Sequence, residues 1–341
     1  MLTENGCFWD KKSGIAVHRR FRAPEVFSYM CGDMKASLEL QLGALKNSMD
    51  YKMDIANFLE PWYGIGTVSS AFGTNYEWHD KQAPACKPPF NSVSDALNYN
   101  ILPVERTSIG RHTLDMIEYF LDRTKGKMPI SFADIQSPLN VAASIVNINN
   151  LFLEMYDNPA RVSQLFAIIT DLIIDFTKKQ EELLKDVLVK PGHGFASSRK
   201  FSGLGMSDDA MVMVSDLLYE KFQFPSMEKL GLQFDGVAFH SCGNWSNRIK
   251  LVKKIDNLLM VDGAFSAETD PHPNEPEPFG NELAGSNIVL NARIVGDAET
   301  IISAVNNIWK PGMKLIVVTY CQTPQEQEYV YEKIHEMCEE S

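Results

Sequence analysis

The stretch Gly236-Val237-Ala238-Phe239-His240-Ser241-Cys242 runs from an apolar segment into a histidine and a cysteine, and it sets the pattern for the second half of the chain. Residues two apart in an extended strand point to the same face, so the His240 imidazole and the Cys242 thiol are predicted to lie side by side. A second apolar run, 315–320, ends at Cys321. His-x-Cys alone is weak, because buried thiols are common in protein cores. With Cys321 added, the three side chains match the ligand set of a catalytic zinc that keeps one position open.

Apolar runs and helical patterns alternate regularly around this stretch. Four strands are predicted near the C-terminus, at 235–240, 257–262, 288–293 and 313–319. Helices are predicted between and after them, near 245–255, 297–309 and 323–338, and a Pro-rich acidic loop at 263–287. Upstream, strands are predicted at 55–62, 129–134 and 195–201, and helices at 33–49, 108–125, 159–187 and 215–230. Asp33 and Ser215 are the expected N-caps of two of these helices.

Repeated strand–helix units of this kind imply a parallel sheet with helices outside it. About eight units in one continuous chain favour an α/β fold of the TIM-like (β/α)8 barrel type over a doubly wound sheet. No linker or repeat divides the sequence. We therefore expect one domain over residues 1–341, with residues 1–50 as an N-terminal helical extension.

Composition narrows the functional class. The net charge of −12 over 341 residues argues against nucleic-acid binding, which needs clustered lysine and arginine. No apolar run reaches the roughly 18–20 residues that span a bilayer, so no membrane partner is expected. The N-terminus lacks the pattern of a signal peptide, and the six cysteines are dispersed, so a reducing cytoplasmic location is expected.

Carboxylates and basic residues accompany the predicted metal ligands. Active sites of such barrels lie at the C-terminal ends of the strands, where Asp208 and Asp209 also fall. They are candidates for orienting a ligand or transferring a proton, or else ordinary residues of a helix start or turn. Asp134 and Asp262 occupy comparable positions. The basic cluster at 18–22 is either a solvated segment or an anion-binding cluster, and the 263–287 loop could cover the barrel mouth as a lid.

The ligand set indicates the kind of chemistry. Zinc held by two thiolates is relatively electron-rich, and a metal-bound thiol is a thiolate, the competent nucleophile, at neutral pH. Hydrolytic zinc sites more often use histidine and carboxylate ligands. The sequence therefore favours alkyl transfer involving a thiol over hydrolysis.

These residues resemble the uroporphyrinogen decarboxylase superfamily, and within it the zinc-dependent corrinoid methyltransferases. The motif is His-x-Cys at the end of a barrel strand with a later cysteine, here His240-Ser241-Cys242 and Cys321 followed by Thr323-Pro324. Supporting blocks are found at Ser137–Ala142, Ser207–Ala210 and Tyr219–Phe222.

The resemblance implies a distorted barrel that binds Zn2+ through His240, Cys242 and Cys321. It also implies transfer of a methyl group between a corrinoid such as methylcobalamin, carried on a separate corrinoid-binding protein, and a small-molecule thiol or another methyl donor or acceptor. A homodimer is compatible with this assignment.

Two alternatives stay open. One is a uroporphyrinogen decarboxylase-type tetrapyrrole decarboxylase, although the N-terminal Arg-Gln-Ala-Gly-Arg signature of those enzymes is missing. The other is a non-catalytic barrel that binds a corrinoid or a tetrapyrrole.

Overall fold

A parallel sheet forms the centre of the molecule in the computed structural model, which describes residues 7–339. Its strand order is β1-β10-β9-β8-β7-β6, and every neighbouring pair is parallel. The strands are β1 (Gly14–Arg19), β6 (Leu204–Ser207), β7 (Val237–His240), β8 (Leu258–Ala264), β9 (Val289–Arg293) and β10 (Lys314–Thr319). All six strands therefore end at the same edge of the sheet, as the sequence pattern predicts for the last four.

Shorter backbone pairings continue this sheet into a ring. β4 (Ile130–Ser131) pairs in parallel with β5 (Leu188–Val189), and an isolated bridge joins Leu59 to Ile130. The amide of Gly205 in β6 donates to the carbonyl of Pro191, just after β5. On the other side, the amides of Asp54 and Ile55 donate to the Val17 carbonyl in β1. The chain thus adopts a distorted TIM-like barrel, which confirms the predicted fold class.

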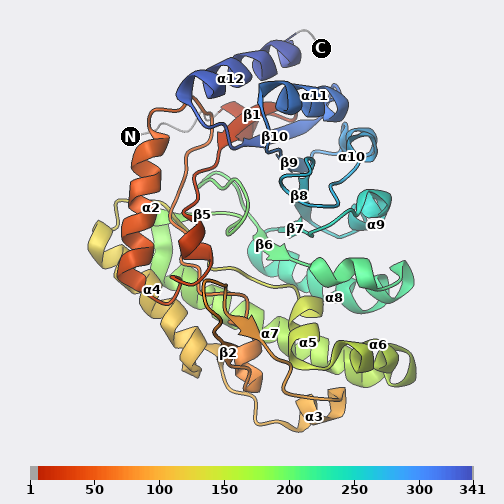
Figure 1. The fold of residues 1–341 in the computed structure, drawn as a ribbon. Helices are drawn as coiled ribbons and strands as arrows, with labels where there is room; N and C mark the ends of the chain where they lie inside the picture. The colour runs from red at the N-terminus through yellow and green to blue at the C-terminus, as the bar shows by residue number, and fades with distance from the viewer. Residues whose placement is uncertain (1–6, 340–341) are drawn as a thin grey trace.

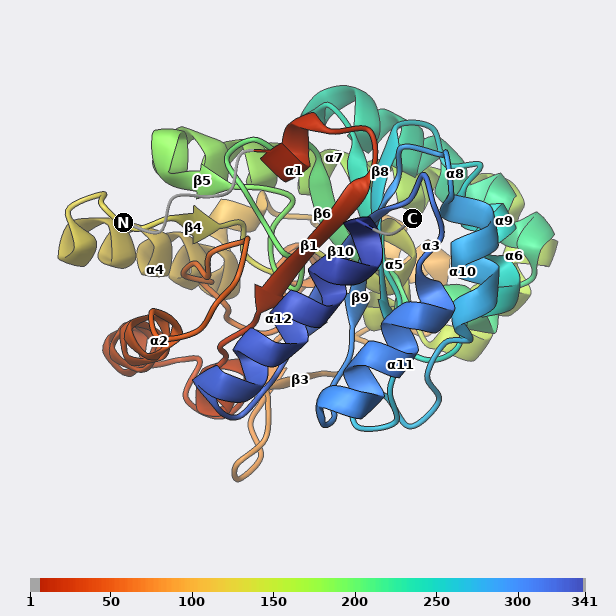
Figure 2. The same ribbon diagram turned by 90° about the horizontal axis from the view of Figure 1, so that it is seen from above.

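Helices cover the outside of the sheet (Figures 1 and 2). The main ones are α2 (Met34–Ser48), α4 (Ser108–Thr124), α5 (Pro138–Ile145), α6 (Ile148–Asp157), α7 (Pro159–Leu184), α8 (Asp216–Phe234), α11 (Ala298–Ile308) and α12 (Pro324–Glu339). The side chains of Asp33 and Ser215 accept backbone N–H groups at the starts of α2 and α8, as expected of N-caps. Among the described residues, the helices are too short or too polar to cross a membrane.

The alternation of side chains along each strand produces two apolar layers. In β7, Ala238 belongs to a small interior cluster with Met260 and Ile316, which lie on other strands. Val237 and Phe239 belong to the larger cluster between the sheet and the helices. His240 therefore continues the interior series and reaches the barrel mouth.

Four expectations need correction. Residues 55–62 and 195–201 are mostly irregular, with isolated bridges at Leu59 and Ser198. Backbone N–H groups in these segments donate to side chains of other elements instead of to a continuous neighbouring strand: that of Glu60 donates to Gln41 in α2, and that of Ala196 donates to Asn291 in β9. The 263–287 segment contains α10 (Pro276–Leu283), which begins with proline in its first turn, where the missing N–H costs nothing.

The fourth correction concerns residues 1–50, which were expected to be a helical extension. They include β1, which lies inside the sheet against β10. The apolar run of β1 is only three residues long and is followed by His18 and then by two arginines, which hid the strand in the sequence. The carboxylate that pairs with Arg20, that of Glu60, is distant in sequence.

Candidate metal centre

His240 and Cys242 lie together at the mouth, as the spacing predicts. His240 is the last residue of β7, and Cys242 follows in the loop. The Cys242 Sγ lies 3.4 Å from the His240 Nε2, and the Cys242 thiol is exposed. An imidazole nitrogen and a sulfur therefore face the same open space.

Asp209 brings a carboxylate to the same place. Its Oδ1 lies 3.7 Å from the His240 Nε2 and accepts the Cys242 backbone N–H at 2.7 Å. One donor atom from each of these three residues lies within 4.8 Å of the other two. Asp209 begins a short 3-10 helix after β6, and its side chain is 46% exposed. The group is open to solvent on one side.

Asp262 fixes the orientation of the histidine ring. Its Oδ2, at the barrel interior on β8, lies 2.5 Å from the His240 Nδ1 and accepts from the Arg293 Nε at 2.9 Å. Its Oδ1 accepts from the Asn291 Nδ2 at 2.5 Å. With Nδ1 used in this way, Nε2 is the ring nitrogen available to a metal.

The charges in this group stabilise each other. Burial alone would lower the pKa of His240, but its hydrogen bonds to Asp262 and Cys242 raise that pKa to about 10. Burial alone would raise the pKa of Asp262, but the charge of Arg293 and the bond from His240 bring it to about 2. Asp262 is thus a permanent anion behind the imidazole.

Cys321 occupies a different layer. It follows β10, and its side chain is 1% exposed within the apolar cluster between sheet and helices. Burial raises the pKa of its thiol to about 11. The neighbouring Tyr320 packs instead against the interior cluster. The structure thus brings together two of the three predicted ligands, and ligation by Cys321, which requires its side chain to turn toward the mouth, stays a prediction.

The neighbouring residues Asp208 and Asp209 have different surroundings. Asp208 is completely buried and accepts hydrogen bonds from the Ser137 Oγ, the Tyr219 hydroxyl and the Gln223 Nε2. Burial raises its pKa to about 6. Asp208 therefore joins α5 and α8 to β6, whereas only Asp209 reaches the candidate metal ligands.

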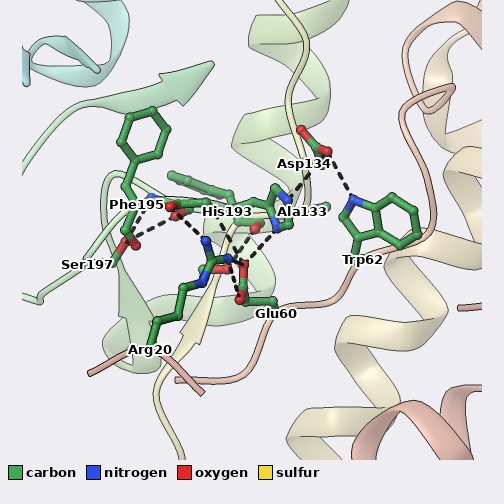
Figure 3. A network of polar contacts seen from close by, with 12 residues as sticks. Arg20, Glu60, Trp62, Ala133, Asp134, His193, Phe195 and Ser197 are labelled. Carbon is green, nitrogen blue, oxygen red and sulfur yellow. Dashed lines mark hydrogen bonds and ion pairs between the residues drawn. The ribbon is translucent and has the colours of Figure 1, made fainter. Parts of the chain in front are cut away.

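A second polar group lies at the mouth (Figure 3). The Arg20 Nη2 donates to the Glu60 Oε1 at 3.1 Å, and the His193 Nδ1 lies 2.7 Å from the Glu60 Oε2. Asp134 accepts from the Trp62 indole at 3.0 Å, and its Oδ2 lies 3.6 Å from the His193 Nε2. His193 lies in a turn between Gly192 and Gly194, and its ring is one of the side chains at the mouth.

Sequence reasoning missed Glu60 and Arg293 as mouth residues. Arg293 ends a predicted strand, and that position was a usable signal. Glu60 gave none, because its strand consists of a single bridge at Leu59.

The donor set suits a zinc ion. Imidazole nitrogen, thiolate sulfur and carboxylate oxygen are all accepted zinc ligands, and the carboxylate behind His240 is the usual partner of a metal-bound histidine. His240, Cys242 and Asp209 would hold such an ion, since their donor atoms already lie within 4.8 Å of one another.

Comparison with known proteins supports the fold. Residues 14–187, about half of the chain, match the family described as uroporphyrinogen decarboxylase (URO-D). The chain belongs to the uroporphyrinogen decarboxylase family. The matched range ends before Asp209, His240, Cys242 and Cys321, so the family match says nothing about these ligands. No curated protein sequence matches this member of the family.

A solved structure is similar over nearly the whole length of the chain. A methyltransferase from Methanosarcina mazei superposes with a TM-score of 0.66 at 13% sequence identity. The match covers 96% of this chain and 94% of the other. At this identity the likeness establishes a shared fold.

Proposed function

We propose that this family member is a zinc-dependent methyltransferase that moves a methyl group between a corrinoid on a partner protein and a small thiol or other methyl donor or acceptor. The observation that carries the proposal is the 3.4 Å approach of the Cys242 Sγ to the His240 Nε2, with Asp209 within ligand distance of both. The similar fold of a methyltransferase is consistent with it.

The residues at the mouth have separate roles in this proposal. His240, Cys242 and Cys321 hold the zinc, which when bound lowers the pKa of a substrate thiol. Asp262 keeps the Nε2 of His240 directed at the metal. The partly exposed carboxylate of Asp209, which lies beside His240 and Cys242, accepts the proton that the substrate thiol loses.

The exposure of the site fits this reaction. Cys242 is exposed and Asp209 is half-exposed, so the metal position faces solvent on one side. A cofactor on a second protein can reach such a position, which a closed structural zinc site would not allow.

The test is metal content combined with methyl transfer. Protein made without a metal-binding tag, loaded with zinc and desalted, should retain close to one zinc per chain. It should remove methyl from free methylcobalamin in the presence of a panel of thiols. Cys242→Ser should lose both properties, and Cys86→Ser, which changes a thiol of the β3 strand (Ala85–Cys86), should lose neither. Absence of retained zinc in the unaltered protein would refute the proposal.

Tetrapyrrole decarboxylation is the second candidate, because the family is named for it. Against it, the signature arginines are missing, and Arg20 is already bound by Glu60. Anaerobic incubation with uroporphyrinogen, followed by product chromatography, separates the two. We expect no coproporphyrinogen; its formation at an enzymatic rate would replace the methyltransferase assignment.

A further inference from the structure

A loop of residues 191–198 follows β5 and precedes β6, and Figure 1 shows it in the middle of the ring of strands. Its two ends are joined, because the Lys190 N–H donates to the Ser198 carbonyl and the Ser198 N–H donates to the Lys190 carbonyl. Phe195 and Ala196 pack in the interior apolar cluster. The loop is therefore a fixed part of the barrel interior.

The second polar group of the mouth holds this loop at its tip. The His193 Nδ1 lies 2.7 Å from the Glu60 Oε2 (Figure 3). The Gly194 N–H donates to the same oxygen at 3.3 Å, and the Gly194 carbonyl accepts from the Arg20 Nη1 at 3.1 Å. The backbone of the loop is thus tied to side chains from two other segments.

Asn291 connects the loop to the candidate metal centre. It lies in β9 and is 0% exposed. Its Oδ1 accepts the Ala196 N–H at 3.1 Å, and its Nδ2 donates to the Asp262 Oδ1 at 2.5 Å. The other oxygen of Asp262 is the one that contacts the His240 Nδ1. A continuous series of hydrogen bonds therefore runs from the loop backbone to the imidazole.

An amide side chain is suited to this position. A carboxamide has one acceptor oxygen and one donor nitrogen, so Asn291 can accept from a backbone N–H and donate to a carboxylate at the same time. Exchanging its oxygen and nitrogen would place two donors face to face at Ala196 and two acceptors face to face at Asp262. The two partners therefore allow a single orientation of the amide, and this orientation fixes Asp262 relative to the loop.

We propose that Asn291 is a positioning residue of the metal centre, which holds Asp262, and through it the ring of His240, in a fixed relation to the interior loop. The proposal rests on the proposed function in one point, that His240 is a metal ligand. Asn291 does not touch the metal position itself, so its effect is on the affinity for zinc. The interior loop thereby contributes to the metal centre without supplying a ligand.

Replacing the amide by an apolar group of similar size tests this role. Asn291→Leu leaves the Ala196 N–H and the Asp262 Oδ1 without this partner. We expect its zinc Kd, measured by competition with a chromogenic chelator, to be roughly tenfold weaker, the lower end of the range for groups that orient a metal-bound histidine. Asn291→Asp, which keeps an acceptor for Ala196 but places a second carboxylate against Asp262, should also weaken binding.

Gln180 in α7 provides the matched control. It too is 0% exposed, and its Oε1 accepts the Ala133 N–H at 2.8 Å. Gln180→Leu should lower Tm, as Asn291→Leu does, and leave the zinc Kd unchanged. A loss of zinc affinity that merely followed the loss of stability would be found in both variants.

A double-mutant cycle shows whether Asn291 acts through Asp262. If it does, adding Asn291→Leu to Asp262→Asn should weaken zinc binding by no more than roughly twofold, because the residue that transmits the effect is already altered. If the two losses multiply in full, Asn291 acts independently of Asp262 and the proposal is overturned.

The outcomes separate this proposal from the proposed function. If zinc affinity depends on Asn291 but no methyl group is transferred, the positioning role stands and the proposed function fails. If Asn291→Leu binds zinc as tightly as the unaltered protein, the positioning role is overturned even where methyl transfer is found. Absence of zinc binding in the unaltered protein overturns both. Thermal unfolding identifies a variant that has lost its fold, and Asn291→Asp then decides in place of Asn291→Leu.

Discussion

Asp262 and His240 are in direct hydrogen-bond contact at the candidate metal centre, with 2.5 Å between the Oδ2 and the Nδ1. Because the carboxylate also accepts from Asn291 and Arg293, it is held by the next strand of the sheet. The direction of the His240 Nε2 is therefore set by three consecutive strands, β7, β8 and β9.

Asp262→Asn should weaken zinc binding by roughly 10- to 100-fold, because loss of the carboxylate behind a metal-bound histidine lowers its basicity and frees its ring. The measurement is competition with a chromogenic chelator. Asp134→Asn, which alters a carboxylate elsewhere at the mouth, is the control and should keep wild-type affinity. Equal affinities of all three proteins would contradict the orienting role of Asp262.

Cys321→Ser should lose zinc and methyl transfer while the barrel stays folded, because a serine hydroxyl stays protonated and binds zinc weakly. Cys31→Ser is a matched control, since Cys31 is also a buried free thiol. Both variants place a hydroxyl in a buried position and should show similar losses of Tm. If both retain zinc, Cys321 stays in its apolar layer and Asp209 takes its place as the third ligand.

Substitution of Asp208 should lower stability, whereas substitution of Asp209 should lower activity. Asp208→Ala leaves three buried donors without an acceptor, so we expect a loss of at least about 2 kcal/mol in the free energy of unfolding. Asp209→Ala removes an exposed carboxylate and should leave stability nearly unchanged while methyl transfer falls. Denaturant unfolding and the methylcobalamin assay together separate the two effects. Loss of activity without loss of stability in Asp208→Ala would contradict the structural role.

His18 should make stability fall in mild acid. It is 2% exposed, its Nδ1 lies 2.9 Å from the Ile55 carbonyl oxygen, and burial lowers its pKa from 6.5 to about 4. Between pH 6.5 and pH 4, His18 is protonated in the unfolded chain but neutral in the folded one. Its contribution to the free energy of unfolding is therefore fully present above pH 6.5 and is lost as the pH falls toward 4. The contribution is on the order of 3 kcal/mol.

His18→Asn keeps a donor for the Ile55 carbonyl and removes the titration, so its stability should change less between pH 7 and pH 4.5. Denaturant unfolding at several pH values measures this difference. His272→Asn, at an exposed position, should follow the unaltered protein. Parallel pH profiles for His18→Asn and the unaltered protein would show that the histidine is not the titrating group.

The sequence predicted the barrel and the pairing of His240 with Cys242 because both depend on local periodicity. Continuous apolar runs show β7 to β10, and a spacing of two residues fixes which side chains share a face. The side of β10 on which Cys321 lies was not predictable in this way. Cys321 follows Thr319 by two residues and shares its outward face, whereas Tyr320 turns inward.

Hydrogen-bond partners that are distant in sequence could not be predicted from local patterns either. Glu60 is important because it pairs with Arg20, and neither residue carries a local signal of the other. The segment 263–287 was predicted to be a loop because it is rich in proline. Proline is compatible with the first turn of a helix, and α10 begins with one.

The pairing of β1 with β10 has a consequence for biosynthesis. Gly14 lies opposite Lys314, about 300 residues further along the chain. At roughly 5–20 residues per second, a ribosome needs about 15 to 60 s to make the residues between them. Throughout that time β1 has no partner at the edge that β10 will occupy, and its Ile15-Ala16-Val17 segment must be kept from pairing with other nascent chains. The barrel can therefore close between β1 and β10 only after almost the whole chain has been synthesised.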